Sequence, residues 1–157
     1  DYHQPAQVIQ ENPHLLGQPT TWVYAPALSV DAILDGIRRG HVCISADVNG
    51  PQLELRATNA AGSYMMGDAM PLTGDAQVEV QCHVRGAKGK CLRLIRDGWL
   101  ADECEVQSDD WAYARLMALD QPGYIRAEVI EHVELFGAPD WVMLACTNPI
   151  YMRQAGR

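Results

Sequence analysis

Strict alternation between apolar and polar residues is the feature that most constrains the fold of this chain. In "QVEVQCHVR" (77–85), every second residue is apolar, so these side chains share one side of an extended backbone. The segment "YIRAEVIE" (124–131) repeats the pattern. Strands with one apolar and one polar face are typical of an antiparallel sheet that is solvated on one side. The residues predicted to face the core are Val78, Val80, Cys82 and Val84 in the first segment and Ile125, Ala127 and Val129 in the second.

Strand-like segments of this kind follow one another from residue 41 onward and are separated by Gly, Pro, Asn or Asp. One connection, Asp97-Gly98, is a two-residue signal for a type I′ hairpin. Seven or eight short strands predict an antiparallel immunoglobulin-like β-sandwich, which we assign to residues 47–157. The expected strands are "HVCISA", "QLELRA", "QVEVQCHVR", "KCLRLIRD", "WLADECEV", "WAYARLMAL", "YIRAEVIE" and "WVMLAC".

The N-terminal part, residues 1–46, has a different pattern. Residues 1–28 show no apolar periodicity and are expected to form loop. One amphipathic helix is predicted after them, with Ser29 as its N-cap and Gly40 as its left-handed stop. A strand follows at 42–46, and "DVNGP" after it marks the boundary between the two parts.

Composition excludes several classes of protein. Hydrophobic content of 48% with 20% charged residues is typical of a globular chain. The net charge is −8, and Arg38-Arg39 is the one adjacent basic pair, so the basic stripe that nucleic-acid binding needs is missing. Apolar runs extend over only a few residues, which argues against a membrane span.

The five cysteines are odd in number and show no C-x-x-C spacing, which argues against a disulfide framework and a zinc knuckle. We expect buried, unreactive thiols and a reducing, cytoplasmic environment. His83 and His132 lie on or at the end of strands and are expected to be solvated. The four tryptophans could form a sugar-binding platform, but interior packing is the commoner role in a sandwich.

Asp1 and His3 form an Asp-x-His pair at the start of the sequence. A carboxylate and an imidazole are both good ligands for a divalent metal. Two ligands do not hold a catalytic metal, because three protein ligands are usual. From the residues alone, a polar terminus remains an alternative to half of a metal site.

The order of several motifs resembles the C-terminal part of PHP-type metallohydrolases, in the CehA/McbA-like branch named for the carbaryl hydrolases. The resemblance extends from residue 1 to about residue 152 and lies in the combination of motifs. The motifs are "DYH", "LLGQPTTWVYAPALSVDAILDGIRRGHVCIS", "GSYMMGDAM", "LRLIRDGWL", "GYIRAEVI" and "CTNPIYM".

This resemblance implies that residues 1–46 are the end of a distorted β/α barrel and that the rest is an accessory β domain. Asp1 and His3 match the family's late metal ligands, and Thr20, Thr21 and Trp22 match a supporting or structural stretch behind them. The complete site would hold Zn, Mn or Fe ions and would hydrolyse a phosphoester, an ester or a carbamate. The family's early His-x-His and most of its barrel are missing from this sequence, so the chain alone is expected to be inactive.

The partners implied are the rest of the barrel, supplied by an upstream segment or a complementing chain, and a small ester or phosphoester substrate. A homo-oligomer is also possible, and the residues with catalytic roles cannot be named. The alternative hypothesis is a stand-alone, non-catalytic β-sandwich that binds a protein or a carbohydrate.

Overall fold

The computed structural model describes residues 17–74, 77–135 and 137–154. This part of the chain is mainly β, with one helix, α1 (Val30–Arg39), as the sequence predicts. All eight strands expected from the alternating segments are present. In chain order the strands are β1 (Thr20–Val23), β2 (Val42–Ser45), β3 (Gln52–Asn59), β4 (Gly62–Met65), β5 (Ala69–Leu72), β6 (Val78–Arg85), β7 (Cys91–Arg96), β8 (Trp99–Glu105), β9 (Asp110–Met117), β10 (Gly123–Leu135), β11 (Ala138–Thr147) and β12 (Ile150–Gln154).

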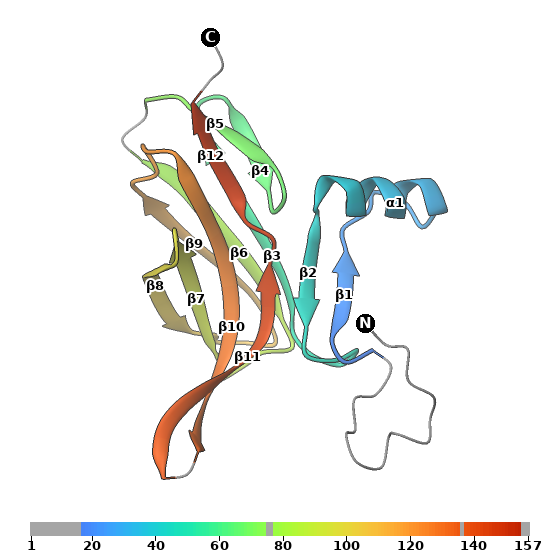
Figure 1. Ribbon diagram of the computed structural model, residues 1–157, viewed down its shortest axis with the longest axis vertical. Coiled ribbons are helices and arrows are strands. Elements are labelled where there is room, and N and C mark those ends of the chain that lie inside the picture. Colours follow the sequence, from blue (N-terminus) through green and yellow to red (C-terminus); the bar gives the residue numbers. More distant parts are fainter. Residues whose placement is uncertain (1–16, 75–76, 136, 155–157) are drawn as a thin grey trace.

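The strands form two sheets (Figure 1). The smaller sheet has the order β4-β3-β6-β9, and all its pairs are antiparallel. The larger sheet has the order β1-β2-β11-β10-β12-β5, and β7 and β8 extend it from the other edge of β10. Its pairs are antiparallel except for β12 with β5, which run parallel.

Strand β10 organises the larger sheet because it has neighbours along both edges. Its first residues pair with β12 and its later residues pair with β11, so these two strands follow each other along one edge. Strand β7 pairs with the middle of β10 on the opposite edge. The hairpin from β7 to β8 has positive φ at Asp97 (51°) and Gly98 (87°), which confirms the predicted type I′ turn.

Inward-facing side chains of both sheets share one hydrophobic core. The prediction for β6 and β10 is confirmed, because each of the seven residues named for the core is at most 2% exposed. Leu53 and Leu55 of β3 add to the core from the small sheet. Leu92 and Leu94 of β7 add to it from the large sheet.

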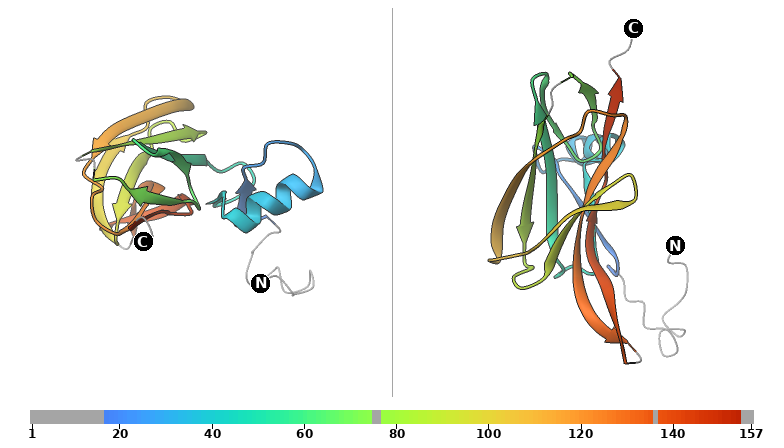
Figure 2. Two further views of the ribbon diagram at one scale, coloured as in Figure 1. Left: turned by 90° about the horizontal axis from the view of Figure 1, so that it is seen from above. Right: turned by 90° about the vertical axis from the view of Figure 1, so that its left-hand side faces the viewer.

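Helix α1 has the ends that the sequence predicts. The Ser29 side chain accepts a hydrogen bond from the backbone N–H of Ala32 at 3.3 Å, and Gly40 ends the helix with φ of 73°. Figure 2 shows the helix projecting from the side of the β-sheets, together with β1 and β2. Buried Gly36 allows the helix to approach β1 closely, since a Cβ at this position would lie 2.5 Å from the carbonyl oxygen of Tyr24.

Among residues 17–46, the structure differs from the prediction in one respect. Residues 20–23 were expected in loop, yet "TTWV" forms β1, because this β-branched and aromatic segment pairs with β2. Strand β2 in turn pairs with β11, so β1 and β2 continue the large sheet. The division at residues 46 and 47 into two domains stays a prediction. Among the described residues, the helix is too short and too polar to cross a membrane.

Candidate functional site

Asp1 and His3, the predicted metal ligands, lie outside the described residues. The stretch predicted to support them forms β1. The Thr20 hydroxyl donates to the carbonyl of Gly17 at 2.5 Å, and Thr21 is exposed. Trp22 packs against the core, and its buried indole Nε1 has no hydrogen-bond partner within the described residues. These three residues therefore lie on β1, an edge strand of the large sheet.

Three of the motifs that carry the resemblance meet at one junction between α1 and the large sheet. His41 follows the helix, Asp68 lies in the turn between β4 and β5, and Asn148 separates β11 from β12. His41 Nε2 lies 2.8 Å from Asp68 Oδ1, and the Asn148 amide donates to the carbonyl of Gly40 at 2.9 Å. The His41 side chain is only 12% exposed. This junction holds distant segments together, and its closed packing is typical of a structural role.

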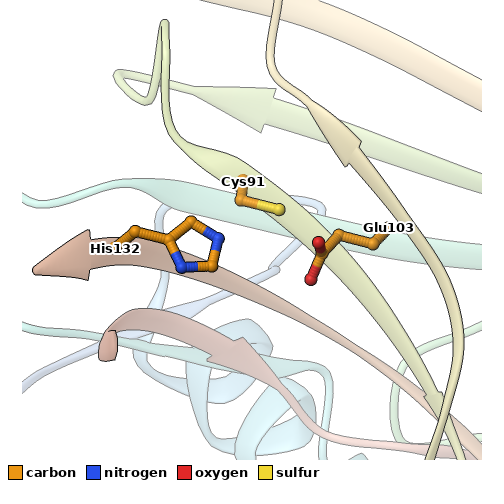
Figure 3. Close-up of side chains that lie close together, drawn as sticks. All are labelled: Cys91, Glu103 and His132. Atoms are coloured by element: carbon orange, nitrogen blue, oxygen red, sulfur yellow. The ribbon is translucent and has the colours of Figure 1, made fainter. Parts of the chain in front are cut away.

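A second group of side chains has the donor atoms of a metal-binding site, with two exposed members, Glu103 and His132, and a largely covered thiol, Cys91. Cys91 of β7, Glu103 of β8 and His132 of β10 place one ligand atom each within 4.8 Å of the others. Figure 3 shows the Glu103 carboxylate and the His132 ring on opposite sides of the Cys91 sulfur. These residues line a hollow of about 390 Å³, which Lys90 and Glu131 also border.

Charge around this hollow is mixed. Arg93 Nε donates to Glu103 Oε2 at 2.5 Å, and Lys90 forms an ion pair with Glu131. Burial raises the pKa of the Cys91 thiol to about 11, and the nearby charge of Glu103 adds to the effect, whereas Arg93 opposes it. The thiol is therefore protonated at neutral pH and is not poised as a nucleophile.

The small sheet carries another polar group on its outer face. His83 Nε2 lies 2.5 Å from Asp110 Oδ1, and Arg85 approaches the same carboxylate at 3.4 Å. The hydrogen bond from His83 lowers the pKa of Asp110, and Arg85 contributes in the same direction. A hollow of about 340 Å³ lies beside His83. His83 is thus paired with a carboxylate. The sequence predicted a solvated side chain and did not predict this partner.

The two sheets are tied together by Asp102 of β8, which accepts hydrogen bonds from Tyr113 and Arg115 of β9. Burial alone would raise the pKa of Asp102, but the two hydrogen bonds outweigh it and the pKa is lowered. Burial of Tyr113 and its hydrogen bond to Asp102 raise the pKa of Tyr113 to about 12, and the negative charge of Asp102 adds to the effect. This cluster is a structural connection between sheets.

The expectations for cysteine and tryptophan are borne out only in part. All five cysteines are free; Cys43 and Cys82 are buried as predicted, and the other three are partly exposed. Interior packing was expected for the tryptophans, but Trp99 is 81% exposed and Trp141 is 46% exposed, so that expectation is wrong for both. Trp99 directly follows the tight turn at Asp97-Gly98. The guanidinium carbon of Arg93 lies over the Trp141 ring, 5.4 Å from the ring centre.

Within residues 17–74, 77–135 and 137–154, the structure thus offers one cluster of mixed metal-ligand donors, at Cys91, Glu103 and His132, which was not predicted from the sequence. Neither the family models nor the curated proteins nor the solved structures that were compared with this chain include a match. The family resemblance therefore remains a hypothesis that depends on the motifs.

Proposed function

We propose that this chain is the C-terminal section of a PHP-type metal-dependent hydrolase. In this proposal, Asp1 and His3 supply the late metal ligands, and the β-sheets form an immunoglobulin-like accessory domain. The substrate is a phosphoester, an ester or a carbamate. The observation that supports the proposal is an uncovered apolar face on α1, beside a strand that has an open edge.

The helical spacing of the sequence places Val30, Ile33, Leu34 and Ile37 on one apolar side of the helix. The uncovered face consists of three of them. Val30 is 73% exposed, Leu34 is 40% exposed and Ile37 is 51% exposed. In a folded protein, a helix with one apolar stripe normally turns that stripe toward a core. Full burial of each such side chain contributes about 1.5–3 kcal/mol, so a further layer of protein packed here would be stabilised substantially.

The adjacent edge of the large sheet supports the same conclusion. Within the described residues, β1 pairs only with β2, which leaves its other edge free for a further strand. Ile44 of β2 is 47% exposed, so this end of the sheet also carries an apolar side chain that is open to solvent. An open strand edge beside an exposed apolar stripe is what the end of a larger α/β layer would look like when the rest of that layer is removed.

The donor chemistry of Asp1 and His3 fits a site for Zn, Mn or Fe, since carboxylate and imidazole are common ligands for all three. Bound metal ions would supply an activated water for hydrolysis. Two ligands leave such a site incomplete, so we expect purified chain, with Mn²⁺ or Zn²⁺ added, to give no turnover of a chromogenic phosphodiester or ester. Turnover well above that of His3→Ala would contradict this expectation.

The decisive experiment uses the full-length parent protein, identified by the intact mass of the natural polypeptide. We expect Asp1→Ala and His3→Ala to lower metal content and kcat together, and the double variant to be far from additive. His14→Ala is the matched control, because this histidine is near in sequence but matches no ligand motif. Full metal content and near-normal rates in the first two variants would show that the proposal is wrong.

The uncovered face can be tested separately. Leu34→Ser and Ile37→Ser should weaken the association of this section with the upstream part of the parent, measured as a lower thermal midpoint of the whole protein. Arg38→Ser is the control, because Arg38 is an exposed polar residue of the same helix. If all three variants lower the midpoint equally, the apolar stripe does not face a partner layer.

The alternative function is a stand-alone β-sandwich that binds a protein or a carbohydrate. The exposed rings of Trp99 and Trp141 favour it, since flat aromatic side chains on a strand surface can stack on sugar rings. A natural polypeptide no longer than this chain, together with loss of ligand binding in Trp141→Ala, would support this alternative over the hydrolase.

A further inference from the structure

We propose that Cys91, Glu103 and His132 form a zinc-binding site on the outer face of the large sheet. This site is separate from the ligands Asp1 and His3 and does not depend on the hydrolase proposal. It would bind one Zn²⁺ ion through a thiolate, a carboxylate and an imidazole, with a water molecule as the fourth ligand. Because the free Cys91 thiol is protonated at neutral pH, binding of the metal would release this proton to solvent.

Strand register explains why these three side chains converge. Cys91 lies on β7, opposite Glu105 of β8 on one side and Ile130 of β10 on the other. Glu103 and His132 are each two residues away from those partners, so both point to the same face of the sheet as Cys91. Glu103 lies diagonally from Cys91 toward one end of β7, and His132 lies diagonally toward the other end, so Cys91 is between them.

The geometry is close to that of a tetrahedral zinc site. Zinc bonds of about 2.3 Å to sulfur and 2.0–2.2 Å to nitrogen and oxygen require donor atoms about 3.4–3.6 Å apart. The three donor atoms here are within 4.8 Å of one another, so a contraction of at most about 1.4 Å is needed. Glu103 and His132 are both exposed, and rotation of their side chains can supply it without movement of the strands.

The donor set selects the metal. A thiolate is a soft ligand that disfavours Mg²⁺ and Ca²⁺, and the combination with imidazole and carboxylate suits Zn²⁺. The open hollow of about 390 Å³ leaves space for the water ligand. Arg93 donates to Oε2 of Glu103, which leaves Oε1 of this carboxylate available to the metal.

The first test is spectroscopic and uses the purified, reduced chain. Co²⁺ is the probe, because a cobalt–thiolate bond gives a charge-transfer band that carboxylate and imidazole ligands do not give. We expect one equivalent of Co²⁺ per chain to produce the band, and one equivalent of Zn²⁺ to remove it. Cys91→Ser should abolish the band, and Glu103→Gln and His132→Asn should each weaken binding by at least about tenfold.

Three control variants distinguish this site from other candidates. Cys146→Ser removes another partly exposed thiol, His83→Asn removes another strand histidine, and His3→Ala removes the ligand of the proposed hydrolase site. All three should bind Co²⁺ as the wild type does. Survival of the band in Cys91→Ser, or its loss in Cys146→Ser, would overturn the proposal, as would the absence of any band in the wild type.

A second test requires only Zn²⁺ and a thermal melt. When the concentration of free Zn²⁺ is a hundred times its dissociation constant, the metal should raise the melting midpoint of the wild-type chain by roughly 5–10 °C. In the absence of metal, the variants at Cys91, Glu103 and His132 should have the melting midpoint of the wild type. Added Zn²⁺ should not raise the midpoint of these variants. Equal rises in Cys91→Ser and the wild type would show that zinc binds elsewhere.

Discussion

Gly67 offers a stringent test of the junction between α1 and the large sheet. Its φ is 95°, and an added Cβ would lie 2.5 Å from the carbonyl carbon of Gly40 and closer still to the carbonyl oxygen of Arg39. Its backbone N–H also donates to the carbonyl of Pro149 at 2.8 Å. Gly67→Ala should therefore force the turn before β5 away from the end of the helix.

The magnitude follows from three contributions. A left-handed backbone costs an alanine about 1–2 kcal/mol, and loss of the hydrogen bond to Pro149 costs about 1 kcal/mol. Separation of two backbone segments adds a packing loss of about 1–2 kcal/mol. We expect Gly67→Ala to lower the free energy of unfolding by about 3–5 kcal/mol in total.

Gly86→Ala is the matched control for this prediction. Gly86 also has positive φ, at 70°, but no described atom lies within 4 Å of the position of its Cβ. This substitution should cost only the backbone contribution of about 1–2 kcal/mol. Urea unfolding followed by tryptophan fluorescence measures both variants against the wild type. If Gly67→Ala is no more destabilising than Gly86→Ala, the close packing of the junction does not contribute to stability and our reasoning fails.

Three further predictions concern stability. Cys82→Ser should cost about 1–3 kcal/mol in chemical denaturation, because a hydroxyl would replace a thiol that is 2% exposed; an unchanged midpoint would contradict the assigned core. Asp102→Asn should cost about 1–2 kcal/mol at pH 7. Because folding lowers the pKa of Asp102, its contribution is present above about pH 4, the range of an ordinary aspartate, and is lost as pH falls through the lowered pKa. The difference between the variant and the wild type should therefore shrink with acidification, and a constant difference would refute this. Gly36→Ala should destabilise, although alanine normally favours a helix by about 1 kcal/mol, because its Cβ would meet the Tyr24 carbonyl at 2.5 Å; a stabilised variant would show that α1 moves freely over β1.

Local signals explain which elements the sequence could predict. The helix had a capping serine at one end and a glycine at the other, and the hairpin had Asp-Gly, so short-range chemistry determined both. The long alternating strands were equally clear. Strands β1, β4, β5 and β12 were not predicted, because each has only four or five residues and no clear alternation, and β5 contains Pro71. Their extended conformation depends on partners elsewhere in the chain, which a local pattern does not show.

The cluster at Cys91, Glu103 and His132 could not be found from the sequence for a related reason. Its three residues come from three strands, and none of them forms a short ligand motif with another. Only the register of β8, β7 and β10 brings them to one face. A one-residue shift in either pairing would turn one donor to the opposite face. The predicted ligands Asp1 and His3 show the reverse case, since their motif is visible in the sequence alone.

The position of β12 has a consequence for synthesis of the chain. This strand is the last one described, yet it lies inside the large sheet, between β10 and β5, with Ile150 and Met152 almost fully buried. During translation, β5 must therefore remain without this neighbour until nearly all of the strands have left the ribosome. The larger sheet therefore cannot be completed before Ile150–Gln154 has been synthesised, and polypeptides that terminate before Ile150 should be substrates for chaperones and proteases.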